Sequence, residues 1–175
     1  ISLSGAQAGM RTDSVHRSAR IMAIEPTRLR EELDRGRVVI VAGFRGLTED
    51  MDVATIGRGG SDTTAVAFAA ALDARCEIYT DVEGVYTADP RVVPEARKLK
   101  DISYEEMLEL ASKGAKVMAP RAVELGSVYN IPILVAHSAK DVPGTLIHGG
   151  ADMEGFNRVR GIAHDIDVAK VTLRH

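Results

Sequence analysis

Short, continuously apolar runs alternate along the chain with segments whose apolar residues recur at helical spacing. Residues 38–42, Val-Val-Ile-Val-Ala, are apolar throughout and mostly β-branched, which predicts a strand buried on both faces. Two further runs predict short strands, at 76–80 and 131–136. Helices are predicted at 25–36, 63–74, 103–113 and 120–129.

Residues at the ends of these segments support the assignment. Pro26 suits a first helical turn and Gly36 a helix exit, while Leu29 and Leu33 share one face. Ser103-Tyr104-Glu105-Glu106 has the spacing of a capping box. Helices alternating with buried strands predict an α/β fold, a three-layer α/β/α sandwich with a mainly parallel central sheet. Ligands bind such sheets beyond the carboxyl ends of the strands.

Composition narrows the classes of function. The 175 residues are 45% hydrophobic and 27% charged with a net charge of −3, which argues against nucleic acid or an anionic membrane as partner. The single cysteine, Cys76, opens a predicted strand and is interpreted as a packed core thiol in a cytoplasmic protein. The chain has no apolar run long enough to span a membrane, and because it starts at Ile1 we expect a fragment.

Residues 57–62, Gly-Arg-Gly-Gly-Ser-Asp, lie directly before a predicted Ala-rich helix. Gly59 and Gly60 allow backbone N–H groups to approach a ligand, and the helix N-terminus favours an anion. Arg58 adds a guanidinium suited to a carboxylate or phosphate. The alternative is that Ser61 or Asp62 only caps the helix. Three glycines beside an arginine exceed what a cap requires, so an anion site is favoured.

A second polar stretch, residues 80–91, follows the strand at 76–80 and could hold the ribose, base and phosphates of a nucleotide. The alternative, a plain polar loop with turns at Asp81 and Asp89-Pro90, is equally compatible with its composition. Lys116 lies near a helix end, where a lysine usually neutralises terminal carbonyls. The five histidines are scattered, so we expect no metal held by the protein.

Six strings, in order, resemble the aspartate kinases of the amino acid kinase superfamily, whose fold is carbamate kinase-like. They are residues 4–9, 41–46, 57–65, 78–91, 114–117 and 143–147. The resemblance covers about residues 1–150. It implies transfer of the γ-phosphoryl group of ATP to the side-chain carboxylate of L-aspartate, which gives 4-phosphoaspartate. This is the first step toward lysine, threonine and methionine.

The resemblance also implies roles for individual residues. Arg58 would bind the α-carboxylate of aspartate, together with Gly59, Gly60 and Ser61, and Asp62 would contact substrate or order the catalytic lysine. Lys116 would contact the ATP phosphates. This differs from the interpretation based on its position alone, in which it neutralises the terminal carbonyls of a helix. Mg²⁺ would be held mainly by those phosphates. The nucleotide pocket would be lined by Thr80, Asp81, Tyr86 and Arg91.

The same resemblance predicts the domain organisation. Residues 1–148 would be the C-terminal part of the catalytic domain, 149–158 a linker, and 159–175 the first strand of an ACT regulatory domain. The family is implied to form homo-oligomers or to assemble with a regulatory subunit. The family's N-terminal Lys-Phe/Tyr-Gly-Gly motif is not in this sequence, and the segment 72–76 is one residue shorter than the family pattern. The chain alone is therefore expected to be inactive.

Two alternatives stay open. Another amino acid kinase, of the glutamate 5-kinase or acetylglutamate kinase type, would share the fold, and the Arg58 loop favours aspartate because it suits a free α-carboxylate. A non-catalytic subunit that binds a nucleotide or an amino acid is the other alternative.

Overall fold

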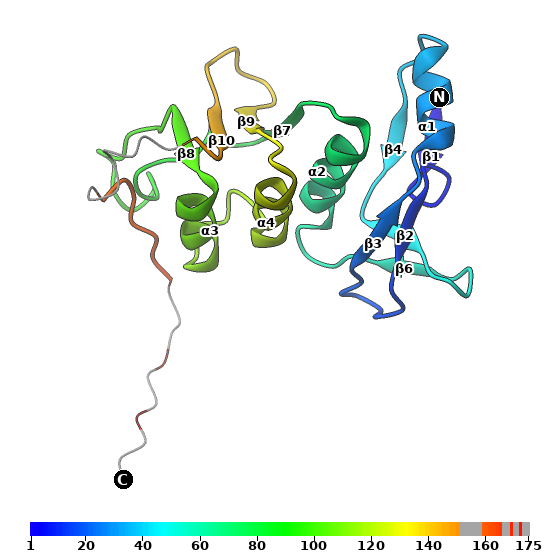
Figure 1. The fold of residues 1–175 in the computed structure, drawn as a ribbon. Coiled ribbons are helices and arrows are strands. Elements are labelled where there is room, and N and C mark those ends of the chain that lie inside the picture. The colour runs from blue at the N-terminus through cyan, green and yellow to red at the C-terminus, as the bar shows by residue number, and fades with distance from the viewer. Residues whose placement is uncertain (151–158, 166–168, 170–171, 173–175) are drawn as a thin grey trace.

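The computed structural model describes residues 1–150, 159–165, 169 and 172 (Figure 1). Most of the predicted linker at 149–158 and part of the predicted ACT strand at 159–175 lie outside these residues. None of the described helices is long and apolar enough to cross a membrane.

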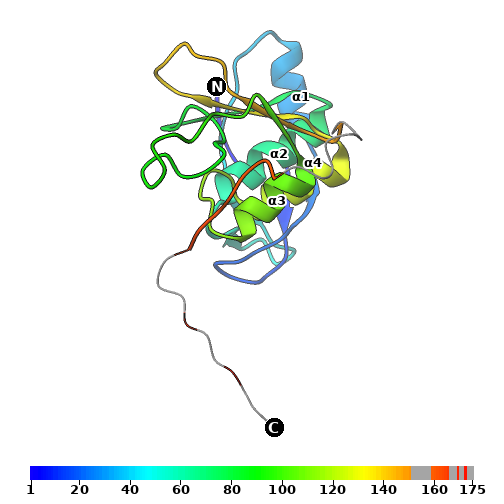
Figure 2. The ribbon, with the colours of Figure 1, turned by 90° about the vertical axis from the view of Figure 1, so that its left-hand side faces the viewer.

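A four-stranded sheet forms the C-terminal half of the fold. Its strands, in spatial order, are β7 (Cys76–Thr80), β9 (Ile133–His137), β10 (Thr145–His148) and β8 (Asp101–Ser103). β7 runs parallel to β9 and β8 parallel to β10, whereas β9 and β10 are antiparallel. Three helices lie side by side along one face of this sheet (Figures 1 and 2): α2 (Gly60–Leu72), α4 (Pro120–Tyr129) and α3 (Tyr104–Ser112).

The N-terminal half contains a two-stranded sheet, a second four-stranded sheet and one helix, α1 (Thr27–Asp34). In the first sheet, β1 (Ser2–Ser4) pairs in parallel with β4 (Ile40–Ala42). The strands of the second, in spatial order, are β3 (Ile21–Ile24), β2 (Met10–Thr12), β5 (Arg45–Leu47) and β6 (Val53–Thr55). The predicted α/β class is confirmed, with parallel-rich sheets. One mainly parallel central sheet was predicted, whereas the described strands form three hydrogen-bonded sheets.

Helix α2 joins the two halves because it contributes to both apolar cores. Its Val66 belongs to the core beneath the four-stranded sheet, where Ile133 and Ile147 are fully buried. Its Phe68 belongs to the smaller core around Met10 and Leu29. Burying each of these large side chains contributes about 1.5–3 kcal/mol. The small residues of α2 let it fit between the two cores.

Several local predictions are confirmed. The predicted helix at 120–129 is α4 and the predicted strand at 76–80 is β7. The capping box opens α3, with the Glu106 N–H donating to Ser103 Oγ at 3.2 Å and the Ser103 N–H donating to Glu106 Oε2 at 3.1 Å. Cys76 is 4% exposed, which confirms the packed core thiol. Burial, followed by the charges of Asp62 and Glu77, raises the pKa of this thiol to about 11.

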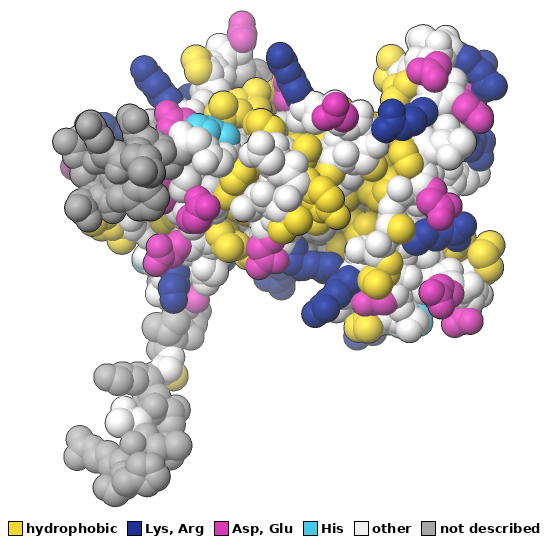
Figure 3. Space-filling view, viewed as in Figure 1, with side chains coloured by type: hydrophobic (Ala, Val, Ile, Leu, Met, Phe, Trp, Pro, Cys, Tyr) yellow, Lys and Arg dark blue, Asp and Glu magenta, His cyan; other side chains and the backbone are white. Residues whose placement is uncertain are grey.

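The predicted double-sided burial of residues 38–42 is wrong. Only 40–42 form strand β4, and Val38 and Ile40 are 81% and 65% exposed. Val39 and Val41 pack against the smaller core, so β4 buries only one face. A continuous apolar run shows that both faces are apolar, but packing from distant segments decides which face is covered. Figure 3, viewed as in Figure 1, shows apolar side chains over the middle of the molecule, from the region of β9 and β7 across to that of β4.

The predicted apolar face of the first helix also needs correction. In α1 Leu29 is buried, but Leu33 is 42% exposed. Glu32 is buried in its place, where its carboxylate accepts hydrogen bonds from Arg35 at 2.9 Å and Arg37 at 2.6 Å. These two arginines compensate the charge that the burial removes from water.

Candidate functional site

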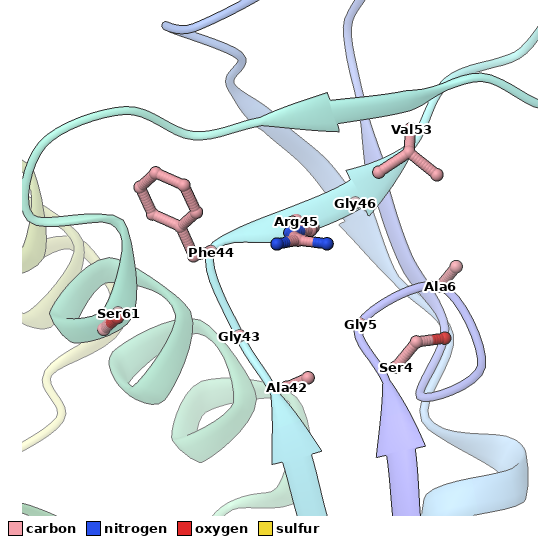
Figure 4. Close-up of a pocket in the computed structure, with 10 residues that line it drawn as sticks. All are labelled: Ser4, Gly5, Ala6, Ala42, Gly43, Phe44, Arg45, Gly46, Val53 and Ser61. Atoms are coloured by element: carbon pink, nitrogen blue, oxygen red, sulfur yellow. The ribbon is translucent and has the colours of Figure 1, made fainter.

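A cavity of about 560 Å³ lies beyond the carboxyl ends of the parallel strands β1 and β4 (Figure 4). Ser4 and Ala42 are the last residues of these strands and lie opposite each other in register. The cavity has the size of a small-molecule site and the position that parallel α/β sheets use for ligands. Its lining comes from four segments: Ser4, Gly5, Ala6; Ala42, Gly43, Phe44, Arg45, Gly46; Val53 of β6; and Ser61 of α2.

Phe44 connects this cavity to the glycine loop, residues 57–62. Its backbone has a left-handed φ of 71°, which is uncommon for a bulky residue. Two hydrogen bonds hold it there: the Phe44 N–H donates to Thr64 Oγ1 at 3.1 Å, and its carbonyl accepts from the Ile56 N–H at 2.9 Å. The ring then lies against Gly60, where an added Cβ would be 2.6 Å from the ring carbon Cδ2. Only glycine fits beside this ring.

The glycine loop is shaped by its backbone and not by a side-chain cap. Gly57 and Gly59 have φ values of 91° and 71°, and Gly59 is the N-cap of α2 with no side-chain cap hydrogen bond. The alternative in which Ser61 or Asp62 only caps the helix is therefore wrong. Ser61 instead lines the cavity, in the first turn of α2 (Figure 4). The loop leaves Arg58 exposed.

Asp62 turns toward the start of α4. Burial raises the pKa of its carboxyl group, and a hydrogen bond from the Ala119 N–H acts in the opposite direction. Gly59 lies against the same residue, because a Cβ added at Gly59 would be 2.3 Å from Ala119 Cβ. Lys116 is three residues earlier, exposed in the turn between α3 and α4. The structure thus places the glycine loop directly against the segment that carries Lys116.

The predicted nucleotide residues follow β7 in one connection, outside the cavity lining. Thr80 Oγ1 donates to Asp81 Oδ1 at 3.0 Å, and the Tyr86 hydroxyl donates to Glu83 at 3.4 Å. Arg91 is 83% exposed and forms a two-nitrogen contact with Asp89, with Nη2 at 2.7 Å from Oδ2. This contact lowers the pKa of Asp89 to about 2.

Some residues of the site were not among the sequence-predicted candidates. Phe44 belongs to the string at 41–46, but nothing in the sequence shows that its ring meets Gly60. Glu83 forms ion pairs with two lysines, with Lys140 Nζ at 2.8 Å and Lys98 Nζ at 3.7 Å from its carboxylate oxygens. These lysines come from separate loops, so no local pattern links them. Within the described ranges, no group of three or more His, Cys, Asp or Glu side chains could hold a metal ion.

Comparison with known proteins identifies the family and the relatives of this chain. Residues 1–137 match the model of the amino acid kinase family. The chain is 55% identical to an aspartokinase of Geobacillus stearothermophilus over 174 residues, 99% of this chain and 43% of that protein. It is 53% identical to aspartokinase 2 of Bacillus subtilis, again over 99% of this chain and 43% of the relative. The chain therefore spans less than half the length of these relatives.

Solved structures agree in fold. A crystal structure of E. coli aspartokinase III in complex with aspartate and ADP has a TM-score of 0.80 and 34% identity, covering 87% of this chain and 35% of that one. Aspartate kinase from Synechocystis has a TM-score of 0.72 and 49% identity, covering 87% of this chain and 25% of that one.

Proposed function

Because this chain belongs to the amino acid kinase family, we propose that it forms part of an aspartate kinase that phosphorylates the side-chain carboxylate of L-aspartate. The observation that carries the proposal is the glycine loop. It places Ser61 in the lining of a cavity at the carboxyl ends of β1 and β4. Arg58, three residues earlier, is exposed. The aspartokinase III structure holds both aspartate and ADP, which supports these two ligands.

In this proposal the glycine loop recognises the amino acid. Arg58 pairs with the α-carboxylate of aspartate, and the backbone at Gly59 and Gly60 with the Ser61 hydroxyl supplies short donors. The side-chain carboxylate is already ionised at neutral pH. Its oxygen attacks the γ-phosphorus directly, and the bond from that phosphorus to the β–γ bridging oxygen breaks. No proton has to be removed, so the protein contributes position and charge.

The nucleotide occupies the connection after β7. Thr80, Asp81 and Tyr86 bind its sugar and base, while Lys116 and Arg91 face its phosphates. Lys116 stabilises the charge that develops on the transferring group, and Asp62 orders this lysine. Arg91 exchanges its contact with Asp89 for a phosphate. Mg²⁺ bound by the phosphates would supply further charge neutralisation there. The complete enzyme acts as a homo-oligomer or with a regulatory subunit, and residues 159–175 lead into an ACT domain.

The test uses the complete gene product with MgATP and either L-aspartate or L-glutamate. Hydroxylamine traps an acyl phosphate as a hydroxamate, whose iron(III) complex is coloured, so it reports the predicted product directly. We expect hydroxamate from aspartate, and we expect Arg58→Gln to raise the KM for aspartate at least tenfold with little change for ATP. Hydroxamate from glutamate alone would assign the protein to another amino acid kinase. Stabilisation of the chain by MgADP with no product from either substrate would support a non-catalytic subunit.

A further inference from the structure

Arg121 joins three segments that are far apart in the sequence. Its Nη1 donates to the Ile56 carbonyl and its Nη2 to the Ala19 carbonyl, both at 3.1 Å. Ile56 and Ala19 are 1% and 0% exposed, so water has little access to replace these donors. Without the guanidinium, these two buried carbonyls would lose the hydrogen-bond donor that Arg121 supplies. The Ala19 N–H in turn donates to the Thr55 carbonyl at 3.0 Å. Through Ala19, Arg121 is therefore also linked to Thr55, two residues before the glycine loop.

The position of Arg121 is electrostatically unusual. It is the second residue of α4, where the partial positive charge of the helix N-terminus disfavours a cation. Among the described residues, no carboxylate lies within 4 Å of its guanidinium to offset this charge. Capping or dipole stabilisation therefore does not account for an arginine here. The two long-range hydrogen bonds do.

The start of α4 contacts the glycine loop at both ends and in the middle. Arg121 holds the carbonyl of Ile56, the residue before Gly57. At the other end the Ala119 N–H lies by the Asp62 carboxylate and acts to lower its pKa, and Ala119 Cβ lies against Gly59 between them. Lys116 precedes this contact segment, residues 119–121, by three residues. The contact segment, residues 119–121, thus holds the loop proposed to bind the amino acid and follows closely on the lysine proposed to face the phosphates.

We infer that Arg121 is a positioning residue that sets the separation between bound aspartate and the transferring phosphoryl group. The inference rests on the proposed function. Arg121 touches neither substrate. It fixes the glycine loop against the segment that follows Lys116, so that the attacking oxygen and the γ-phosphorus are aligned. A misplacement of about 1 Å can cost about 100-fold in rate even when binding is kept.

The kinetic test compares Arg121→Lys and Arg121→Gln with Arg28→Gln in the complete gene product. Arg28 is a matched control, because it is the second residue of α1 and exposed. Lysine keeps the charge but cannot present two fixed donors to both carbonyls. We expect kcat to fall about 10- to 100-fold in both Arg121 variants, with the KM for ATP within about twofold of wild type. Arg28→Gln should match wild type. An unchanged kcat in Arg121→Lys overturns the inference.

A second measurement separates this inference from the proposed function. Hydrogen exchange at the amides of residues 57–62 is measured on the 175-residue chain without substrates. Arg121→Lys should speed exchange at these amides at least tenfold relative to amides of β9, and Arg28→Gln should not. Unchanged exchange overturns the positioning role whatever the substrate is. Faster exchange in a protein that does not phosphorylate aspartate retains the structural contact and rejects the proposed function.

Discussion

Substituting Gly59 by alanine tests the contact between the glycine loop and α4. Gly59 has a left-handed φ of 71°, and an added Cβ would lie 2.3 Å from Ala119 Cβ. Gly36, at the end of α1, has the same φ of 71° and no atom within 4 Å of an added Cβ. Both glycines therefore need a left-handed backbone, but only an added Cβ at Gly59 would meet Ala119. Gly36→Ala is thus a matched control.

The two costs can be worked out separately. A left-handed backbone costs an alanine about 1–2 kcal/mol, and this is the whole effect expected for Gly36→Ala. Gly59→Ala adds the overpacking against Ala119, which costs about 1–3 kcal/mol more. The free energy of unfolding should therefore fall by about 2–5 kcal/mol in Gly59→Ala. Ala119→Gly removes the opposing methyl group, after which the nearest remaining atom is the Ala119 Cα at 3.5 Å.

The assay is urea unfolding of the 175-residue chain, followed by circular dichroism. It compares Gly36→Ala, Gly59→Ala, Ala119→Gly, and Gly59→Ala combined with Ala119→Gly. The double variant should recover stability to near that of Gly36→Ala, with a coupling energy of about 1–3 kcal/mol between the two sites. Equal costs for Gly59→Ala and Gly36→Ala would refute the contact with Ala119. So would the absence of coupling in the double variant.

Three further outcomes are expected. Ser103→Ala removes the acceptor for the Glu106 N–H and should cost about 1 kcal/mol of unfolding free energy, measured by the same unfolding curves, whereas no loss would contradict the capping box. Cys76, with its pKa raised to about 11 and 4% exposed, should react with a thiol reagent at pH 8 only after unfolding, so rapid labelling of the folded chain would contradict its burial. The pKa of Asp62 is raised above its ordinary value of 3.8 by burial, so the folded state binds the proton more tightly. Wild-type stability should therefore fall relative to Asp62→Asn as pH rises from about 3.8 through the folded pKa, and parallel pH profiles of the two proteins would contradict this.

Local residues determined several elements fully. The Ser103–Glu106 pair specifies the start of α3, because both hydrogen bonds of a capping box form within four residues. Pro120 suits the first turn of α4, and Asn130 ends this helix in a left-handed conformation. The glycine loop was predicted to be an anion site because three glycines beside an arginine exceed the needs of a turn, and this stays a prediction. These features depend on residues close in sequence.

Other features depended on contacts that no local pattern encodes. The chain 38–42 has two apolar faces, but Val39 and Val41 are covered by the smaller core while Ile40 stays exposed, because distant segments supply the cover. The ring of Phe44 against Gly60 joins segments that are adjacent only in the folded state.

By itself, the sequence determined the α/β class, the presence of the four helices and the glycine loop with its Arg58, since these depend on short-range periodicity and backbone requirements. Only the tertiary structure decided what that loop rests on. It placed Ser61 in the cavity, turned Asp62 to the Ala119 N–H and brought Arg121 to the carbonyl of Ile56. The Arg121 bond spans 65 residues of sequence, and a hydrogen bond over that distance exists only when the packing of α2 against α4 brings its two atoms together.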